Sequence, residues 1–383
     1  MKILMIAPTP FFSDRGCHVR IFEEIKGLKS LGHDVTIYTY HLGKDPEGVN
    51  IKRIKNVPSY TKTSAGPSYK KIYLDLLLLS KLLKDVKKED YDIIHAHLHE
   101  GAGIGMILKY FKKIPMIFDY QGSLVKEMRD HKYLNNKPLK SIFKKIEKKI
   151  NNSSKYLLTS STKSKESLEE EGYKNVISFL DWVDTEKFNK KDATKLKEEL
   201  NLKDKQVITF LGVLSKYQGT DLLLNTIPLV IKEIPDAHFL IAGYPNVELY
   251  KEKAKELGIS EHVTFTGQID YNLAPEYIST GDITISLKLS KTEANGKLYN
   301  YMACGIPTIA TNNEINKEIL QETGIYVEPN IKDCSEKIIS LLKNENLRRK
   351  LGNDAREKVV NIHSWKNRGQ ILTEVYEKCL KSH

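Results

Sequence analysis

Cysteine is scarce in this sequence, and long apolar runs are missing. The four cysteines stand far apart, without the spacing of metal ligands: Cys17, Cys304, Cys334 and Cys379. This pattern argues against a disulfide scaffold or a zinc site, and it predicts a reducing, cytoplasmic location. The longest apolar stretch, Tyr73 to Leu83, is interrupted by polar residues and is too short for a helix that spans a bilayer.

The glycine motif of dinucleotide-binding proteins is missing as well. The first predicted strand, Lys2 to Ala7, leads through Pro8 and Pro10 to a lone Gly16, before a helix that begins near His18. The prolines favour a buried strand over a signal peptide. The sequence lacks the motif G-x-G-x-x-G, which is the main signature of a dinucleotide-dependent dehydrogenase, so this class of enzyme is not favoured. Gly16 either lets the backbone approach a phosphate at the helix N-terminus or forms a plain tight turn.

The composition is that of a soluble globular protein with an uneven charge. The chain has 383 residues, 40% hydrophobic and 28% charged, so we expect two domains. Its net charge is +11. Residues 1–180 carry 32 basic and 20 acidic side chains, a net charge of +12, whereas residues 181–383 have a net charge of −1. The first half is therefore expected to meet an anionic surface.

Short apolar runs alternate with longer amphipathic patterns, which predicts two α/β domains whose parallel sheets are covered by helices. We place an N-terminal domain at residues 1–180 and a C-terminal domain at 181–362, with a helix over 363–383 that packs back on the first domain. Two such domains create a cleft at the carboxyl ends of their strands, which typically holds a nucleotide. Strands are expected at Lys2–Ala7, Val35–Tyr40, Ile93–Ala96, Met116–Asp119 and Tyr156–Ser160, and then at Gln206–Leu211, His238–Ala242, Val263–Thr266, Ile283–Leu287 and Thr308–Ala310.

Polar side chains follow two predicted strands of the first domain. His95, His97 and His99 alternate at one strand end, which is compatible with metal binding. No second cluster completes a ligand set, so structural histidines are favoured. Asp119 and Gln121 follow the next strand and suit a sugar or a phosphate, or else the cap of the following helix.

In the second domain, a loop between Gly212 and Gly219 joins a strand to a helix. Lys216 is its one charged residue, and Gln218 stands next to Gly219. A flexible loop, a cation and a helix N-terminus together suit a diphosphate. The alternative is an ordinary exposed loop lysine.

The densest polar cluster lies at another strand-to-helix turn. Its members are Glu293, Asn295, Gly296 and Lys297, with Asn300 one helical turn after Lys297. Glu293 suits sugar hydroxyls and Lys297 suits phosphate oxygens. The alternative for Glu293 is a first-turn residue favoured by the helix dipole.

These motifs resemble those of the GT-B glycosyltransferases, specifically the retaining glycosyltransferase family 4. The run Tyr301 to Pro307, YMACGIP, is the most specific of them. The resemblance covers nearly the whole chain and implies two Rossmann-like, doubly wound parallel-sheet domains that face each other across a cleft. It is carried by Arg15-Gly16, Leu31 to Val35, Asp92 to His97, Asp119 to Ser123, Tyr217 to Gly219 and Glu293 to Ala310.

The resemblance implies a hexosyltransferase-type enzyme that moves a sugar from a nucleotide-sugar to a glycan or lipid-linked acceptor. Transfer in this family retains the anomeric configuration and needs no metal or other cofactor. The donor is expected on the C-terminal domain and the acceptor on the N-terminal domain. By position, Glu293 holds the donor sugar, and Lys297 and Gln121 share the catalytic roles. The donor-binding residues are Gly16, Gly212, Lys216, Gln218, Gly219, Asn295, Gly296 and Asn300, and the acceptor-side residues are His97 and Asp119.

Several positions depart from the family pattern. The Arg and Lys that bind the donor diphosphate in the family fall at Val213 and Gln218, and we expect Lys216 and Lys297 to supply the charge instead. Asn300 stands in place of the second glutamate of the E-x(7)-E motif, which binds the ribose, and it comes one residue early.

Two other interpretations stay open. A nucleotide-sugar epimerase or hydrolase on the same fold needs an acid/base set, for which His95, His97 and Asp119 are the candidates. A non-catalytic sugar-binding subunit is suggested by the altered family positions. The family's acceptor-side histidine falls at Gln121, which cannot donate a proton as imidazolium does.

The basic excess has two interpretations. Residues 136–149 predict a helix with Leu139, Ile142, Phe143 and Ile146 on one face and six lysines around it. Such a helix either lies on an anionic membrane, which predicts a peripheral location at the inner face of the cell membrane, or packs its apolar face on the domain. Nucleic acid is not an expected partner, because no binding module or stacking platform accompanies the charge.

Overall fold

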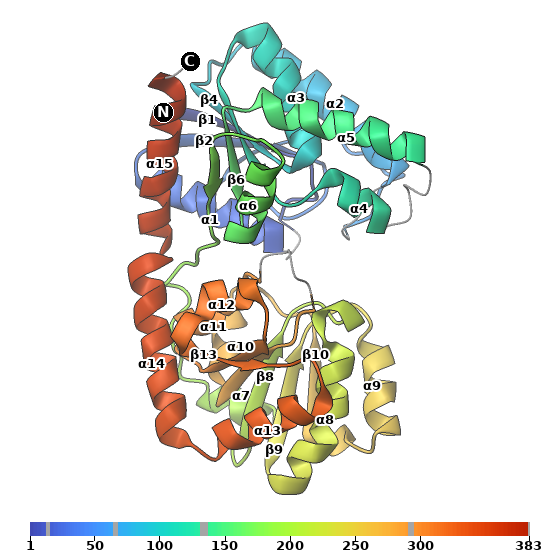
Figure 1. Cartoon of the computed structure of the whole chain (residues 1–383), viewed down its shortest axis with the longest axis vertical. Coiled ribbons are helices and arrows are strands. Elements are labelled where there is room, and N and C mark those ends of the chain that lie inside the picture. Colours follow the sequence, from blue (N-terminus) through green and yellow to red (C-terminus); the bar gives the residue numbers. More distant parts are fainter. Residues whose placement is uncertain (13–15, 64–67, 131–136, 290–294, 382–383) are drawn as a thin grey trace. The chain divides into compact units, whose positions relative to one another are not determined.

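The computed structural model describes residues 1–12, 16–63, 68–130, 137–289 and 295–381 (Figure 1). The chain divides into two compact units. Unit 1 consists of Met1–Leu180 with Trp365–His383, and unit 2 consists of Asp181–Ser364.

Unit 1 is built on a seven-stranded parallel sheet with the order β3-β2-β1-β4-β5-β6-β7. Both of its faces are covered, so the central strands are buried at consecutive positions and not only at alternate ones. The order reverses between β1 and β4, and a ligand site is expected beyond the carboxyl ends of strands at such a point. The strands are β1 (Lys2–Ala7), β2 (Asp34–Thr39), β3 (Asn50–Arg53), β4 (Ile93–His97), β5 (Met116–Tyr120), β6 (Tyr156–Thr159) and β7 (Val176–Ser178).

Helices cover the two faces of this sheet. Right-handed crossovers place α1 on one face and α2, α3, α5 and α6 on the other. Helix α15 packs on α1, where Gly27 and Gly369 let the backbones approach: a Cβ on Gly27 would lie 3.0 Å from the carbonyl oxygen of Trp365. The helices are α1 (Gly16–Ser30), α2 (Tyr69–Asp85), α3 (Leu98–Lys112), α4 (Leu124–Asp130), α5 (Lys137–Ser153), α6 (Thr162–Glu170) and α15 (Trp365–Lys381).

Unit 2 contains a six-stranded parallel sheet with the order β10-β9-β8-β11-β12-β13, which reverses between β8 and β11. The strands are β8 (Gln206–Leu211), β9 (Ala237–Ala242), β10 (Val263–Gly267), β11 (Ile283–Ser286), β12 (Thr308–Thr311) and β13 (Gly324–Val327). The helices are α7 (Thr194–Glu199), α8 (Thr220–Glu233), α9 (Val247–Glu256), α10 (Ala274–Ser279), α11 (Lys297–Ala303), α12 (Glu314–Leu320), α13 (Ile331–Leu342) and α14 (Glu345–Ile362), with 3-10 turns η1 (Lys216–Gln218), η2 (Ser260–His262) and η3 (Gln321–Thr323).

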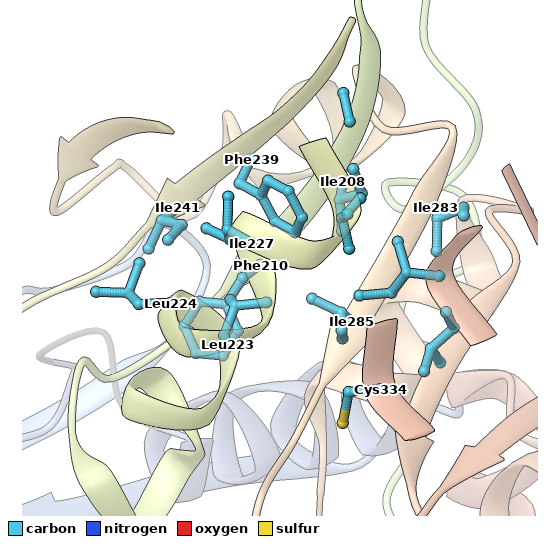
Figure 2. Close-up of a cluster of buried hydrophobic side chains, with 14 of the residues drawn as sticks. Ile208, Phe210, Leu223, Leu224, Ile227, Phe239, Ile241, Ile283, Ile285 and Cys334 are labelled. Atoms are coloured by element: carbon cyan, nitrogen blue, oxygen red, sulfur yellow. The ribbon is translucent and has the colours of Figure 1, made fainter. Parts of the chain in front are cut away.

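The main core of unit 2 lies between α8, the central strands and α13. Figure 2 shows Phe210 of β8 and Phe239 of β9 beside Leu223 and Ile227 of α8, with Cys334 of α13 at the edge. These side chains are almost completely buried. Because this packing fixes the ends of β8 and β11, it also fixes the loops that follow them.

The predicted α/β class, with two Rossmann-like parallel-sheet domains, is confirmed. Strand β8 begins and ends at the predicted residues, and most other predicted strands differ by one residue at an end. Within the described part of the chain, no helix is both long and apolar enough to cross a bilayer.

Candidate functional site

The loops that follow β8 and β11 meet at the point where the strand order of unit 2 reverses. Gly212 follows β8 with φ of 152°, and Gly219 ends the η1 turn with φ of 81°. A Cβ on Gly219 would lie 2.2 Å from the carbonyl oxygen of Leu287, which directly follows β11. Glycine is therefore required at position 219 both by its backbone conformation and by the close approach of the two loops.

Lys297, the first residue of α11, reaches across to the loop after β8. Its Nζ donates a hydrogen bond to Oε1 of Gln218 over 3.1 Å and lies 4.4 Å from the centre of the Phe210 ring. A Cβ on Gly212 would come within 2.7 Å of this Nζ. Gly212 therefore leaves the space that the lysine ammonium occupies.

The Lys297 ammonium has an unusual electrostatic environment. Burial, and after it the nearby charge of Lys288, lower the pKa of Lys297 to about 7. Among the described residues, no carboxylate forms an ion pair with this ammonium; its contacts are Gln218 and the Phe210 ring. An ammonium held in this way attracts an anion strongly, because an anion replaces the missing counter-charge.

Asp119, at the end of β5 in unit 1, is completely buried and accepts hydrogen bonds from three side chains. Arg20 of α1 contacts both carboxylate oxygens, at 3.2 and 2.9 Å. His97 Nδ1 and Gln121 Nε2 lie 3.2 and 3.0 Å from Oδ2. Burial opposes ionisation, but the Arg20 guanidinium and the His97 hydrogen bond hold the pKa of Asp119 below its usual range. Arg20 also donates to the carbonyl oxygen of Phe179.

His95 and His97 point into the same buried region, where Glu24 of α1 joins them. The ligand atoms of these three residues lie within 4.8 Å of one another. Arg20 Nε stands 3.3 Å from Glu24 Oε1, so this carboxylate shares the guanidinium with Asp119. His95 Nδ1 lies 2.8 Å from the hydroxyl of Tyr376 on α15, and burial lowers the pKa of His95 well below its usual value. The cluster therefore fits a structural charge network better than a metal site.

His99 does not join the other two histidines. It lies in the first turn of α3, edge-on to the rings of Phe118 and Tyr120, with its Nε2 3.5 Å from Glu147. Burial lowers the pKa of His99 to about 3, which keeps the ring neutral. Of the three predicted histidines, only His95 and His97 therefore share one cluster.

Comparison of the sequence with known families gives two matches that together cover most of the chain. Residues 15–186 match the family described as Glycosyltransferase Family 4, and residues 192–358 match Glycosyl transferases group 1. The chain is a GT-B glycosyltransferase of the family 4 type. The expectation of a glycosyltransferase enzyme is thereby confirmed at the level of its class.

Three curated relatives illustrate the range of this family. Spore coat protein SA of Bacillus subtilis is 29% identical over 48% of this chain and 52% of its own length. The N-acetyl-alpha-D-glucosaminyl L-malate synthase of Bacillus anthracis is 26% identical over 74% of each chain. A GDP-mannose-dependent phosphatidylinositol monomannoside mannosyltransferase of Mycolicibacterium smegmatis is 26% identical over 50% of this chain and 54% of its own. The chain thus spans only about half the length of two of these relatives.

A solved structure supports the fold over the full length. Anabaena HepE, crystallised with UDP and glucose, superposes with a TM-score of 0.80 over 99% of this chain and 100% of its own. The two sequences are 14% identical, so this likeness concerns the fold.

In this glycosyltransferase, the residues predicted for the donor site do not all lie together. Gly212, Gln218 and Lys297 meet at one point. Lys216 is exposed in the η1 turn. Asn300, half-buried, follows Lys297 by one turn of α11. Gly16 begins α1 in unit 1.

The other members of the predicted polar cluster after β11 are Glu293, Asn295 and Gly296. Glu293 lies outside the described residues. Asn295 is buried, and its amide donates to Asn316 Oδ1 over 2.9 Å and contacts Ser286 Oγ. These hydrogen bonds join the segment after β11 to α12. The contact of Asn295 with the donor stays a prediction. A Cβ on Gly296 would lie 3.3 Å from Asp181 Oδ2, a tight contact that a small shift of the Asp181 side chain relieves.

Sequence reasoning missed Arg20 and Glu24. Both lie on the same side of α1 as the buried Ile21 and Ile25, and both are themselves buried. The available signal was their i, i+4 spacing within the apolar face, where a charged pair needs partners from elsewhere in the fold. Those partners are distant in sequence: Asp119 is 99 residues from Arg20, and His95 is 71 residues from Glu24.

Proposed function

We propose that this glycosyltransferase transfers a hexose from a nucleotide-sugar bound by unit 2 to a glycan or lipid-linked acceptor bound by unit 1. The activities of two relatives, one that uses GDP-mannose and one that makes a glucosaminyl malate, support a nucleotide-sugar donor, as do the UDP and glucose bound by HepE. The phosphatidylinositol mannoside acceptor of one relative supports a lipid-linked acceptor.

The observation that carries this proposal is the Lys297 ammonium at the strand-order reversal of unit 2. Departure of a nucleoside diphosphate places negative charge on phosphate oxygens, and stabilising that charge is the main task of the reaction. Lys297, with Lys288 near it, provides positive charge at the loops where a ligand binds in such sheets. Glycine at 212 and 219 lets a diphosphate approach the backbone closely.

We further propose that transfer retains the anomeric configuration and proceeds without a metal ion. In a front-face reaction, the departing phosphate oxygen accepts the proton of the acceptor hydroxyl while the new glycosidic bond forms, so no protein base is needed. The two lysines then meet the charge that a divalent cation meets in other transferases. Glu293 is proposed to hold the hydroxyls of the donor sugar, and Asn300 the ribose.

The epimerase interpretation receives less support from the structure. Its acid/base candidates, His95, His97 and Asp119, are completely buried, and their polar atoms contact one another, Arg20 and Tyr376. A catalytic acid or base must reach the atom that it protonates or deprotonates. These residues are better suited to stabilise the carboxyl edge of the sheet in unit 1.

A donor screen tests the proposal. The full chain is incubated with a panel of nucleotide-sugars, with and without glycan or lipid-linked acceptors, and with EDTA in a parallel series. Turnover that requires an acceptor, gives a product of the donor's own anomeric configuration and survives EDTA is the expected result. Turnover without acceptor would identify a hydrolase or epimerase, and binding without any turnover would identify a non-catalytic subunit.

A further inference from the structure

Helix α2 carries large apolar side chains on two opposite faces. Leu74, Leu78 and Leu82 face the core and are completely buried. On the other side, four side chains remain 56% to 77% exposed: Tyr69, Ile72, Tyr73 and Leu76. Their spacing of i, i+3, i+4 and i+7 makes one continuous stripe, and a contiguous apolar surface of this kind marks an interaction site.

Helix α5 contributes a second exposed apolar row, surrounded by lysines. Leu139, Ile142 and Ile146 are 39% to 52% exposed, whereas Phe143 is half-buried and Ile150 is buried. The predicted apolar face of this helix is therefore only partly covered by the domain, and a row of three side chains keeps about half of its surface in water. The alternative of an ordinary surface helix that buries its apolar stripe describes α5 only in part.

The exposed charged side chains described in α5 are all lysines. Five lysines of the helix are exposed, namely Lys140, Lys144, Lys145, Lys148 and Lys149, and no ion pair with the described residues is recorded for them. Its one acidic residue, Glu147, is buried and accepts hydrogen bonds from the backbone N–H groups of Leu124 and Val125 at the start of α4. Glu147 thus neutralises none of the outward charge.

The two rows lie on the same side of unit 1. Helices α2, α3 and α5 cover one face of the sheet, and α3 contacts both of the others (Figure 1). Because α2 and α5 both lead into the amino ends of strands, their first halves, which carry the apolar rows, both lie toward the carboxyl edge of the sheet. Gln121 follows β5 at this same edge.

We propose that the docking surface, defined as Tyr69, Ile72, Tyr73 and Leu76 of α2 with Leu139, Ile142, Ile146 and the five exposed lysines of α5, binds the surface of an anionic lipid bilayer. Apolar side chains that enter the interface and lysines that meet phosphate headgroups are the two components that such binding requires. The charge excludes a basic partner, and the aliphatic and tyrosine row suits the headgroup boundary. This surface places unit 1 where a lipid-linked acceptor lies, and in that respect it extends the proposed function.

Vesicle sedimentation of the full chain tests the docking surface. We expect binding to vesicles of equal parts phosphatidylglycerol and phosphatidylcholine, little binding to phosphatidylcholine alone, and a marked loss at high salt. Reversing Lys144, Lys145, Lys148 and Lys149 to Glu is expected to lower the partition coefficient roughly tenfold or more. The matched control reverses four exposed lysines of unit 2, Lys195, Lys203, Lys332 and Lys343, and is expected to bind vesicles nearly as the wild type does.

The apolar row is tested in the same assay. The double variant Ile72→Ser/Leu76→Ser is expected to lose most vesicle binding, whereas Leu229→Ser/Leu249→Ser, at exposed positions of unit 2, keeps it. Equal sedimentation of the wild type and of both docking-surface variants would overturn the proposal. So would wild-type indifference to anionic lipid, or a dimer in analytical ultracentrifugation that the α2 variant dissociates while vesicle binding stays unchanged. No donor or acceptor is present, so failure here is distinct from failure of the transfer reaction.

Discussion

The ammonium of Lys297 and the amide of Gln218 are joined by a hydrogen bond of 3.1 Å between Nζ and Oε1. The resemblance to family 4 implies a lysine for the donor diphosphate at the position of Gln218. The Lys297 ammonium extends from the start of α11 to the same loop. We propose that it supplies the positive charge in place of that lysine.

Replacing Lys297 with methionine is expected to weaken binding of the nucleotide-sugar roughly 10- to 100-fold, because a hydrogen bond to a charged group contributes about 1.5–3 kcal/mol. Methionine keeps most of the buried chain length, so unit 2 stays folded. Calorimetric titration measures the affinity. Lys332→Met, on the exposed side of α13, is the matched control and binds as the wild type does. Equal affinity of Lys297→Met and the wild type would remove Lys297 from the donor site.

Donor binding is expected to weaken as the pH rises through about 7. Burial and the neighbouring Lys288 lower the pKa of Lys297 to about 7, so the ammonium that attracts the diphosphate is present below this pH and lost above it. A nucleotide-sugar has no phosphate proton that titrates near pH 7, so its own charge is constant. Titrations at pH 6 and pH 8.5 measure the change, and Lys297→Arg should bind without this dependence, since arginine stays charged. An unchanged affinity in the wild type would contradict the prediction.

The lowered pKa of Lys297 also makes the free energy of unfolding depend on pH, in the direction opposite to donor binding. Without donor, the folded protein holds the Lys297 proton less tightly than the unfolded chain does. The free energy of unfolding should therefore rise with pH above about 7 as far as this residue is concerned. Donor binding and stability then respond to pH in opposite directions, which separates a local effect at Lys297 from general denaturation.

The sequence predicted the sheets and the basic helix α5, but it did not indicate the exposed apolar row of α2, for a physical reason. Buried parallel strands such as β8 are continuous apolar runs, which a single sequence displays directly. The apolar run of α2 was noted, but apolar residues on both faces of a helix do not reveal which face stays in water. That distinction depends on the packing of α3 against α2.

The candidate site was predictable only in part. The glycines at 212 and 219 and the lysine at 297 were found because backbone approach and charge at a strand end have a local pattern. Asn295 was assigned to the donor, yet its amide is bound to Asn316, a contact that no spacing indicates. Arg20 was missed because its carboxylate partner is distant in sequence.

Removing the charge of Asp119 is expected to destabilise unit 1 by about 1–3 kcal/mol, because the buried Arg20 guanidinium then loses one charged partner and keeps Glu24. Asp119→Asn keeps the shape and removes the charge. Urea unfolding followed by circular dichroism measures the loss, and Asp92→Asn, at a carboxylate that accepts a bond from the exposed Lys2 backbone, is the milder control. The contribution of Asp119 is present at neutral pH and is lost as the pH falls, since its pKa is held low in the folded state.

A double-mutant cycle tells a specific pair from a general loss of packing. The combined variant Arg20→Met/Asp119→Asn should cost less than the sum of the single variants, because each single variant already removes the direct contacts between the two residues. Additive losses would show that the two residues stabilise unit 1 independently, against the direct contacts between them.

Gly212→Ala is expected to impair donor binding about as strongly as Lys297→Met. A Cβ at this position would lie 2.7 Å from Lys297 Nζ and 3.3 Å from Cε, so the ammonium must leave Gln218. The backbone adds a cost of about 1–3 kcal/mol, because φ of 152° strains any residue with a Cβ. Gly267→Ala separates these effects: Gly267 has φ of 70°, and its Cβ would meet no atom within 4 Å. We therefore expect Gly267→Ala to lower the melting temperature but leave the donor affinity unchanged, whereas Gly212→Ala lowers both. Should Gly212→Ala bind the nucleotide-sugar like the wild type, the position of the Lys297 ammonium would not matter for donor binding.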